Sequence, residues 1–363
     1  MKQSYYFSYV FCLLLILGCS SDDSSEIEIP MDGIPDPDLI YFPPTDGSET
    51  WETKSVSELE WNSNQLQPLL DFLEEKNTKS FMILHNGKIV VESYLNTHTS
   101  SSPWYWASAG KTLTTAVIGI AQEEGLLNIN NKVSDYIGTG WTSAPLEKEN
   151  LITCKNLLSM TSGLDDLSDN ISAENLQCIA GAGERWAYHG VFLKLQDVVS
   201  TTSNQTWISY FNTKLKDRIG MTGSWVPFEN TNGYWSTTRS MARFGLLTSA
   251  NGKWEDSQIV TENYLNDAKN TSQSLNKSYG YMWWLNGKST YRLPQTQIEF
   301  TGSLIPNAPS DMYCALGKND QKLYVVPSKN LVIIRMGESA EDSNFALSNF
   351  DNDLWEKINA FID

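Results

Sequence analysis

The spacing of apolar residues changes along the chain, and each change predicts a different element. Two short apolar stretches between Phe81 and Leu95 flank His85-Asn86-Gly87, and Asn-Gly is the strongest short signal for a hairpin of antiparallel strands. From Lys111 to Gly125 apolar residues recur at helical spacing, and the glycine provides a natural end. The pattern therefore predicts a β-hairpin followed by a helix.

The middle of the chain, about 130 to 300, has mostly helical patterns, over 191–199, 206–219 and 239–249, separated by loops rich in Gly, Asn, Thr and Ser. Strand patterns return at 312–316, 322–326 and 331–336. The chain closes with an amphipathic helix that carries Phe345, Leu347, Phe350, Leu354, Trp355, Ile358 and Phe361. We expect an α/β chain of the α+β type, in which an antiparallel sheet built from both chain ends is flanked by helices and accompanied by an α-rich domain.

The first 55 residues differ from the rest. The apolar run from Tyr9 to Leu17 follows Lys2 and is shorter than the ~20 residues of a membrane-spanning helix, which predicts an export signal. It ends in Leu-Gly-Cys19, which resembles the lipobox of bacterial lipoproteins and implies a lipid on Cys19; an ordinary secretory signal with an incidental cysteine is the alternative. The following acidic Ser-Ser-Asp-Asp-Ser-Ser resembles the surface-export signals of some bacterial lipoproteins.

These patterns divide the chain into three parts. We expect a lipoprotein signal peptide over 1–18, an acidic, Pro-rich tether over 19–55 and a folded domain over 56–363. Within this domain, the sheet part is expected at about 70–125 and 305–363, and the α-rich part at about 126–304. The protein would then be exported, and its partners would include the membrane, through the lipid anchor at Cys19.

Composition excludes several classes of protein. Hydrophobic residues make up 40% and charged residues 19%, which excludes a wholly disordered chain and a multi-span membrane protein. The net charge of -17 repels phosphate backbones, so no nucleic-acid partner is expected. Three histidines and no Cys-x-x-Cys predict no metal site. An exported location permits a Cys154–Cys178 bridge, with buried free thiols as the alternative.

The candidate chemistry begins with Ser108-Ala109-Gly110-Lys111, where the predicted helix starts. Residues three apart share a helix face, so the Lys111 amine can approach the Ser108 hydroxyl. To accept a proton near neutral pH, this lysine needs a pKa about three units below its usual ~10.4. A second Ser-x-x-Lys, Ser274 to Lys277, stands in a polar stretch without an apolar helix behind it, and we expect it to be incidental.

Several motifs together resemble the penicillin-recognising serine hydrolases. They are SAGK at 108–111, GLLNI at 125–129, ITCKNLLSMTSGL at 152–164 and GERWAYH at 183–189. The most similar branch is the class C beta-lactamase-like one, with related esterases, D-amino-acid peptidases and 6-aminohexanoate-dimer hydrolases. The resemblance covers roughly residues 70 to 360, and the order of several motifs makes it more specific than any single motif.

This resemblance implies roles for individual residues. Ser108 would be the acylated nucleophile, Lys111 its proton partner and Tyr188 the tyrosine that moves a proton to the leaving group. In Gly317-Lys318-Asn319-Asp320-Gln321, where the family has Lys-Thr-Gly or His-Gly-Gly, Lys318 would be the cation that attracts a substrate carboxylate, with Asn319 beside it in the substrate site. The backbone N–H groups of Ser108 and Gln321 would bind the oxyanion. No cofactor is implied.

Two positions depart from the family pattern. Gly190 occupies the asparagine position of Tyr-x-Asn, and Asp320 replaces a glycine whose missing side chain lets substrate approach the strand. Both put the turnover of beta-lactams in doubt, whereas neither changes the nucleophile. The resemblance therefore implies hydrolysis of an ester or amide bond, with a beta-lactamase or D-Ala-D-Ala carboxypeptidase as one alternative and a degenerate, non-catalytic surface-binding protein as another.

Three further features compete for roles in the site. Ser168-Asp169-Asn170 resembles the Ser-Asp-Asn element of class A beta-lactamases, although no Lys-Thr-Gly or Lys-Ser-Gly accompanies it. His189 could serve a Ser-His-Asp triad, although no Gly-x-Ser-x-Gly is present. The aromatic residues Tyr281, Trp283 and Trp284 could shape specificity or fill the core, and the sequence leaves both open.

Overall fold

The computed structural model describes residues 40–363 except 169, 229–230 and 342–345. These residues fall within one compact unit, Gly33–Asp363. The predicted signal peptide, Cys19 and Phe345 lie outside the described residues. None of the helices among the residues described has the length and apolar character needed to cross a membrane.

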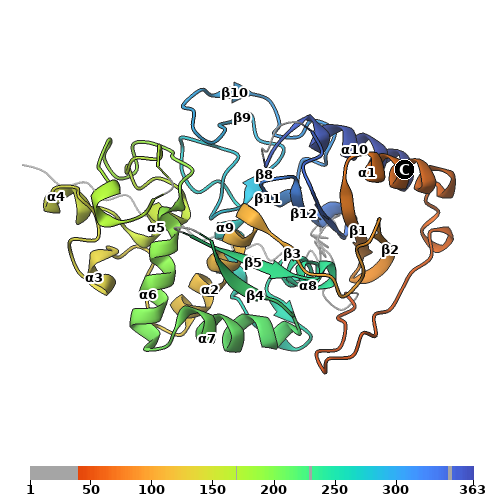
Figure 1. Ribbon diagram of the computed structural model, residues 1–363, viewed down its shortest axis with the longest axis horizontal. Helices are drawn as coiled ribbons and strands as arrows, with labels where there is room; N and C mark the ends of the chain where they lie inside the picture. The colour runs from red at the N-terminus through yellow and green to blue at the C-terminus, as the bar shows by residue number, and fades with distance from the viewer. Residues whose placement is uncertain (1–39, 169, 229–230, 342–345) are drawn as a thin grey trace, which may run out of the picture. The chain divides into compact units, whose positions relative to one another are not determined.

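The main sheet has six strands in the order β2-β1-β13-β12-β11-β8, with antiparallel neighbours (Figure 1). Its strands are β1 (Thr78–His85), β2 (Lys88–Tyr94), β8 (Trp284–Leu285), β11 (Tyr313–Gly317), β12 (Gln321–Val326) and β13 (Leu331–Gly337). Asn86 and Gly87 join β1 to β2 with positive φ values of 48° and 77°, which confirms the hairpin read from Asn-Gly. The sheet is built from both ends of the chain, as expected, and only β8 comes from the middle.

Helices cover both faces of this sheet. On one face lies α8 (Thr238–Ser249), so close that a Cβ on Gly245 would lie 2.7 Å from Leu323 of β12. The next side chain along β12, Tyr324, points to the other face and packs on Trp355 of α10 (Asn349–Ile362), with ring centroids 5.6 Å apart. In Figure 1, α1 (Leu66–Glu75) lies beside α10. The alternation of side chains along β12 thus serves two helical layers.

Charged side chains are buried between β12 and α10. Lys322, fully buried, lies 3.1 Å from Asp320 and 2.7 Å from Asp351. Arg335 of β13 donates hydrogen bonds of 3.0 Å to the carbonyl oxygens of Asn319 and Asp320. Because a buried charge is tolerated only when it is paired and hydrogen-bonded, this cluster fixes the turn between β11 and β12.

The predicted helix after the first hairpin is α2 (Lys111–Glu123), followed by Gly125 at φ 72°. The other helices of the middle region are α3 (Ser134–Ile137), α4 (Leu146–Glu149), α5 (Cys154–Leu158), α6 (Lys194–Ser203), α7 (Trp207–Phe211) and α9 (Glu262–Ala268). The helix expected over 206–219 is broken, because a π-helical turn, Asn212–Lys216, and a 3₁₀ turn, Asp217–Ile219, follow α7. Further 3₁₀ turns are Ser57–Leu59, Ser63–Gln65, Ala107–Gly110, Ala173–Asn175, Gly190–Leu193 and Pro327–Lys329.

A second sheet, which the sequence analysis did not predict, has the order β3-β5-β4. Its strands are β3 (Trp104–Tyr105), β4 (Ser224–Phe228) and β5 (Thr231–Ser236). Two small ladders pair β6 (Lys253–Trp254) with β7 (Ser257–Gln258) and β9 (Thr290–Tyr291) with β10 (Phe300–Thr301). Two of the sheet's strands, β4 and β5, interrupt the stretch expected to be helical. They were not predicted because each has six residues or fewer and gives only a weak periodic signal.

Part of the expected tether packs onto the domain. Trp51 is buried and donates a 2.7 Å hydrogen bond from Nε1 to the carbonyl oxygen of Gly87, and the Tyr41 N–H donates to the Asn86 carbonyl at 3.0 Å. Arg243 of α8 stacks on the Trp51 ring at 5.2 Å. Residues 40–55 therefore belong to the folded unit. Cys154, Cys178 and Cys314 are free thiols, so the Cys154–Cys178 bridge is not formed.

Candidate active site

Ser108 lies in the 3₁₀ turn that leads into α2. The preceding Ala107 has φ 48°, a left-handed conformation that costs energy in a residue other than glycine and is found where surrounding contacts enforce it. Trp106 enforces it here, since its backbone N–H donates to the Tyr234 carbonyl at 2.8 Å and its indole N–H donates to Ser236 Oγ at 2.7 Å. The turn that carries the serine is thereby held on β5.

Lys111 is the first residue of α2 and reaches back to the serine. Its Nζ lies 2.7 Å from Ser108 Oγ, and it faces the rings of Tyr188 at 4.7 Å and Phe192 at 4.9 Å. A hydroxyl at this distance from an amine can pass its proton to that amine as it attacks a carbonyl. The predicted approach of the Lys111 amine to the Ser108 hydroxyl is therefore present in the structure.

Tyr188 lies beside the same pair. Its ring stacks on Trp284 with centroids 5.8 Å apart and meets Tyr279 edge-on at 6.1 Å, which fixes its orientation. Burial raises the pKa of the Tyr188 phenol to about 12, although a hydrogen bond with Ser108 acts in the opposite direction. The phenol thus carries its proton at neutral pH and can donate it.

A cavity of about 610 Å³ opens over these three side chains. It is lined by Tyr105, Ala107, Ser108, Gly110, Lys111, Tyr188, His189, Gly190, Phe192, Leu193, Trp225, Val226, Pro227, Phe228, Thr231, Asn232, Gly233, Trp235, Lys318 and Asn319. The cavity brings together all but one of the residues expected in the catalytic and substrate sites. Its wall from β4 and β5 was missed, because strands of five and six residues give only a weak periodic signal.

The turn between β11 and β12 contributes Lys318 and Asn319 to the lining of the cavity. A Cβ on Gly317 would lie 2.3 Å from the Trp106 carbonyl oxygen, so only glycine allows this strand to approach the serine turn so closely. Lys318 is exposed, and Asn319 donates from Nδ2 to the Tyr105 hydroxyl at 2.6 Å. Gly317 therefore allows the strand to approach the serine turn, a contact separate from the approach of substrate expected at the position taken by Asp320.

The structure changes the interpretation of Gln321 and Asp320. Gln321 is fully buried and does not line the cavity. Its side-chain Nε2 donates hydrogen bonds to the carbonyl oxygens of Asn319 and Gly337, at 2.8 and 2.7 Å. Asp320 is also fully buried, and its carboxylate pairs with Lys322 rather than entering the cavity. Asp320 therefore does not obstruct substrate, whereas Gly190 does line the cavity, as its place beside Tyr188 implied.

Of the competing features, His189 lines the cavity, whereas the others lie elsewhere. His189 Nε2 lies 2.8 Å from the Ser168 carbonyl oxygen, which can only accept, so this nitrogen donates there. Ser168 is not among the cavity residues. Tyr281, Trp283 and Trp284 are each at most 3% exposed and fill the core, where Trp284 supports Tyr188. Within the described parts of the chain, no cluster of three or more His, Cys, Asp or Glu residues could hold a metal ion.

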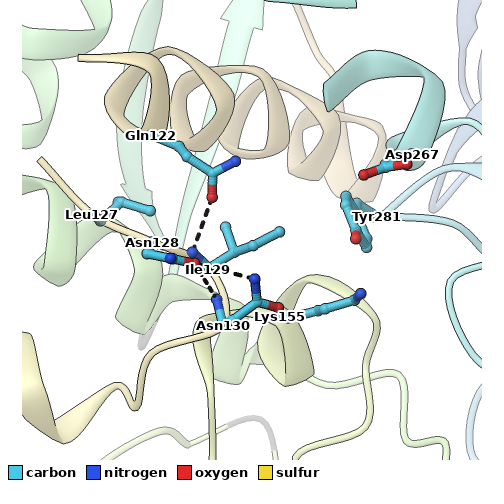
Figure 2. Close-up of a pocket in the computed structure, with 8 residues that line it drawn as sticks. All are labelled: Gln122, Leu127, Asn128, Ile129, Asn130, Lys155, Asp267 and Tyr281. Atoms are coloured by element: carbon cyan, nitrogen blue, oxygen red, sulfur yellow. Dashed lines mark hydrogen bonds between the residues drawn. The ribbon is translucent and has the colours of Figure 1, made fainter. Parts of the chain in front are cut away.

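A second cavity, of about 380 Å³, lies between α2 and the loop that follows it (Figure 2). Figure 2 shows Gln122 of α2 accepting a hydrogen bond from the Ile129 N–H at 3.0 Å. The Lys155 N–H donates to the Ile129 carbonyl at 2.7 Å, and its Nζ lies 6.0 Å from the centre of the Tyr281 ring. These contacts join α2 to the motif segment at 125–129 and that segment to the one at 152–164, so these two motifs hold neighbouring parts of the fold together.

A family model described as Beta-lactamase matches residues 73–353. The chain belongs to the beta-lactamase family. This match spans the strands of the main sheet, the Ser108 turn and the wall formed by β4 and β5. The match confirms the family resemblance read from the sequence and the serine hydrolase fold of the family. A comparison with curated protein sequences finds no match.

Solved structures share the beta-lactamase fold. A Bacillus anthracis protein described as a 6-aminohexanoate-dimer hydrolase is 21% identical, with a TM-score of 0.65 over 92% of this chain and 89% of its own. A beta-lactamase from Mycobacterium bovis is 17% identical, with a TM-score of 0.59 over 81% and 99%. EstCE1, a hydrolase with promiscuous acyltransferase activity, is 10% identical, with a TM-score of 0.62 over 85% and 99%. The fold therefore serves several hydrolase activities, and the substrate must be argued from this chain's own residues.

Proposed function

We propose that this protein hydrolyses an ester or amide bond through an acyl-enzyme formed on Ser108. The observation that carries the proposal is the 2.7 Å contact between Lys111 Nζ and Ser108 Oγ at the floor of a 610 Å³ cavity. A nucleophile in hydrogen-bond contact with a base is the arrangement that acyl transfer requires. A non-catalytic binding protein would have no need of it.

The proposed first step is attack of Ser108 Oγ on the substrate carbonyl carbon while the serine proton passes to the neutral amine of Lys111. The tetrahedral intermediate then collapses as the Tyr188 phenol protonates the leaving alcohol or amine, and the proton on Lys111 returns to Tyr188. Water attacks the resulting ester by the reverse sequence and frees the acid. Every proton that is taken up is returned, so the cycle needs no cofactor.

The oxyanion needs donors near Ser108, and the expected N–H of Gln321 lies in the β11–β12 ladder opposite Gly317. We assign the second donor to Lys318, the next residue after Gly317, because this residue lines the cavity whereas Gln321 does not. Together with the Ser108 N–H, in the helical turn that leads into α2, the backbone N–H of Lys318 completes the proposed pair of donors to the substrate carbonyl oxygen. Each such donor is typically worth ~3–4 kcal/mol of the activation barrier.

The same site suits esters and linear amides better than beta-lactams. Gly190 presents no side-chain amide to the cavity, so the contact that the Tyr-x-Asn asparagine makes with an acyl amide is absent here. The similarity to a protein described as a 6-aminohexanoate-dimer hydrolase and to a hydrolase with acyltransferase activity points in the same direction. Beta-lactamase or D-Ala-D-Ala carboxypeptidase activity is the second candidate, favoured by the family match.

The proposal includes export and a lipid anchor at Cys19, supported by the charged start, the short apolar run and the Leu-Gly-Cys sequence. This proposal is tested by growing cells that produce the protein in medium that contains labelled palmitate. Label on the wild-type protein and none on Cys19→Ala would support the anchor. A wild-type protein without label would contradict it.

The catalytic proposal is tested by intact-mass spectrometry of the purified protein after exposure to a fluorophosphonate and, separately, to a penicillin. We expect one fluorophosphonate adduct on the wild type and none on Ser108→Ala. Without the reagent, we expect turnover of p-nitrophenyl acetate only by the protein that can form this adduct. Rapid penicillin turnover would favour the second candidate. An unlabelled, folded wild-type protein would overturn the enzyme assignment.

A further inference from the structure

One face of the sheet β3-β5-β4 is turned into the cavity. In the pairing register, Tyr105 lies opposite Trp235, Gly233 lies opposite Val226, and both pairs line the cavity. Directly opposed residues of antiparallel strands project from the same face, and residues two apart on one strand do too. Tyr105, Trp235, Gly233, Val226 and Phe228 therefore form a continuous surface, the apolar face.

The two outermost side chains of this face are large, hydrophobic and open to solvent. Val226 is 40% exposed and Phe228 is 65% exposed, whereas Trp225, which alternates with them along β4, is 7% exposed and packs against the core. Exposed apolar groups that flank a catalytic cavity mark a binding surface more often than isolated ones do. Pro227, between Val226 and Phe228, is exposed as well. Trp225 and Pro227 also line the cavity, so the exposed apolar groups belong to the outer end of β4 where it borders the cavity.

Gly233 gives the face its depth. A Cβ built on it would meet nothing within 4 Å, and its backbone has no positive φ that would require glycine. The missing side chain leaves open space between Val226 and Trp235, rather than relieving a close contact as at Gly317. Its position at the centre of an apolar wall leaves a slot that an alkyl or aromatic group would fill.

The surroundings of the slot fix its polarity. Phe192 and Leu193 add further apolar groups to the cavity, and the charged side chains that line it are Lys111, beside Ser108, and Lys318, on the β11–β12 turn. Neither lysine lies on the strands of the apolar face. A substrate group placed along this face would lose contact with water without leaving a buried charge unpaired.

We propose that the substrate of the Ser108 site is an ester or amide that carries an extended apolar group next to the scissile carbonyl, and that this group lies on the apolar face with Gly233 as the residue that sets its size. The inference rests on the proposed function and adds the class of substrate. An apolar group on the acyl side and one on the alcohol side would share this chemistry.

The test measures kcat/KM for two series with the full wild-type chain. One series varies the acyl group, from p-nitrophenyl acetate through butyrate to octanoate, and the other varies the alcohol, from ethyl through butyl to octyl acetate. Since burial of one methylene favours binding about fourfold, we expect at least a tenfold rise from the shortest to the longest member of one series. The series that rises identifies the side of the scissile bond.

Substitutions locate the effect. Gly233→Leu fills the slot, and we expect it to reduce the long-to-short kcat/KM ratio at least tenfold. Phe228→Ser, at a position exposed enough to leave the fold intact, is expected to reduce the ratio about fourfold. Ile298→Ser is the matched control, since Ile298 is 62% exposed and does not line the cavity, and it should leave the ratio unchanged.

Each outcome is decisive. A chain-length ratio that falls in Gly233→Leu and Phe228→Ser but not in Ile298→Ser supports the inference. Equal rates across both series, or a ratio that none of the substitutions changes, would overturn it while labelling of Ser108 by a fluorophosphonate leaves the proposed function standing. No labelling and no turnover of any ester would overturn the proposed function, and this inference with it.

Discussion

Two copies of Ser-x-x-Lys in this chain have opposite environments. Ser108 and Lys111 lie at the start of a buried helix, in hydrogen-bond contact at 2.7 Å. Ser274 and Lys277 lie in an exposed turn outside any helix, and the Lys277 amine donates to Ser289 Oγ at 3.4 Å instead. The motif alone is therefore uninformative, and its surroundings decide whether the pair meets.

Three features surround the first copy and are absent from the second. A helix start places residues three apart on one face, Trp106 fixes the serine turn on β5, and the Tyr188 and Phe192 rings cover the amine. At the second copy the side-chain Oδ1 of the intervening Asn276 accepts hydrogen bonds from the backbone N–H groups of Ser278 and Arg292, which shapes a turn. Substitution at matched positions of the two copies tests this contrast.

The largest difference is expected at the serines. Ser108→Ala should lower kcat/KM for p-nitrophenyl acetate by on the order of 10⁴-fold or more, because no acyl-enzyme can form. Ser274→Ala should keep the wild-type value within about twofold, measured on protein of equal thermal stability. Substantial loss of activity in Ser274→Ala would break the contrast.

The lysines should differ next. Lys111→Met keeps the length of the side chain but removes the base, so kcat should fall roughly 10²–10⁴-fold, and the pH dependence that the amine confers should vanish. Lys277→Met should change neither kcat nor the pH profile. A pH profile of Lys111→Met that matches that of the wild type would show that another group accepts the proton.

Tyr188→Phe should have a smaller effect of about 10²-fold on kcat, since the ring contacts with Trp284 and Tyr279 remain and only the proton donor is lost. Because the pKa of Tyr188 is raised to about 12, its ionisation should not limit the wild-type rate below about pH 11. The loss should be greater for substrates with poor leaving groups than for p-nitrophenyl esters. Equal losses for both would remove Tyr188 from the proton path.

The smallest effect is expected at two crowded glycines. A Cβ on Gly317 would lie 2.3 Å from the Trp106 carbonyl, so Gly317→Ala should displace the β11–β12 turn and lower kcat about 10- to 100-fold. A Cβ on Gly287, which follows the second copy in the chain, would lie 2.2 Å from the Ser310 carbonyl oxygen. Gly287→Ala should therefore lower the melting temperature and leave kcat per labelled site unchanged. Equal kcat in both variants would mean that the approach of Gly317 does not position the site.

The sequence predicted the elements that have strong local signals. The hairpin at Asn86-Gly87 and the helix from Lys111 are present, although β1 begins at Thr78 rather than Phe81 and α2 ends at Glu123, and the three C-terminal strands lie within about a residue of the expected bounds. What it missed depends on pairing between distant segments, above all the apolar face, where β3 is a strand of only two residues and its partner β5 lies more than a hundred residues away. The side-chain direction of Asp320 and Gln321 likewise depends on a buried partner, Lys322, and on the carbonyl of Gly337.

The most direct test of the account is to locate the fluorophosphonate adduct by peptide mapping of the wild-type protein. The account predicts that the label lies on the peptide containing Ser108, that Ser274 and Ser168 are unlabelled, and that Lys111→Met slows the labelling at least a hundredfold. A label on Ser274 or Ser168, or labelling of Ser108 at the same rate without the Lys111 amine, would contradict the claim that the surroundings of the first Ser-x-x-Lys create the nucleophile.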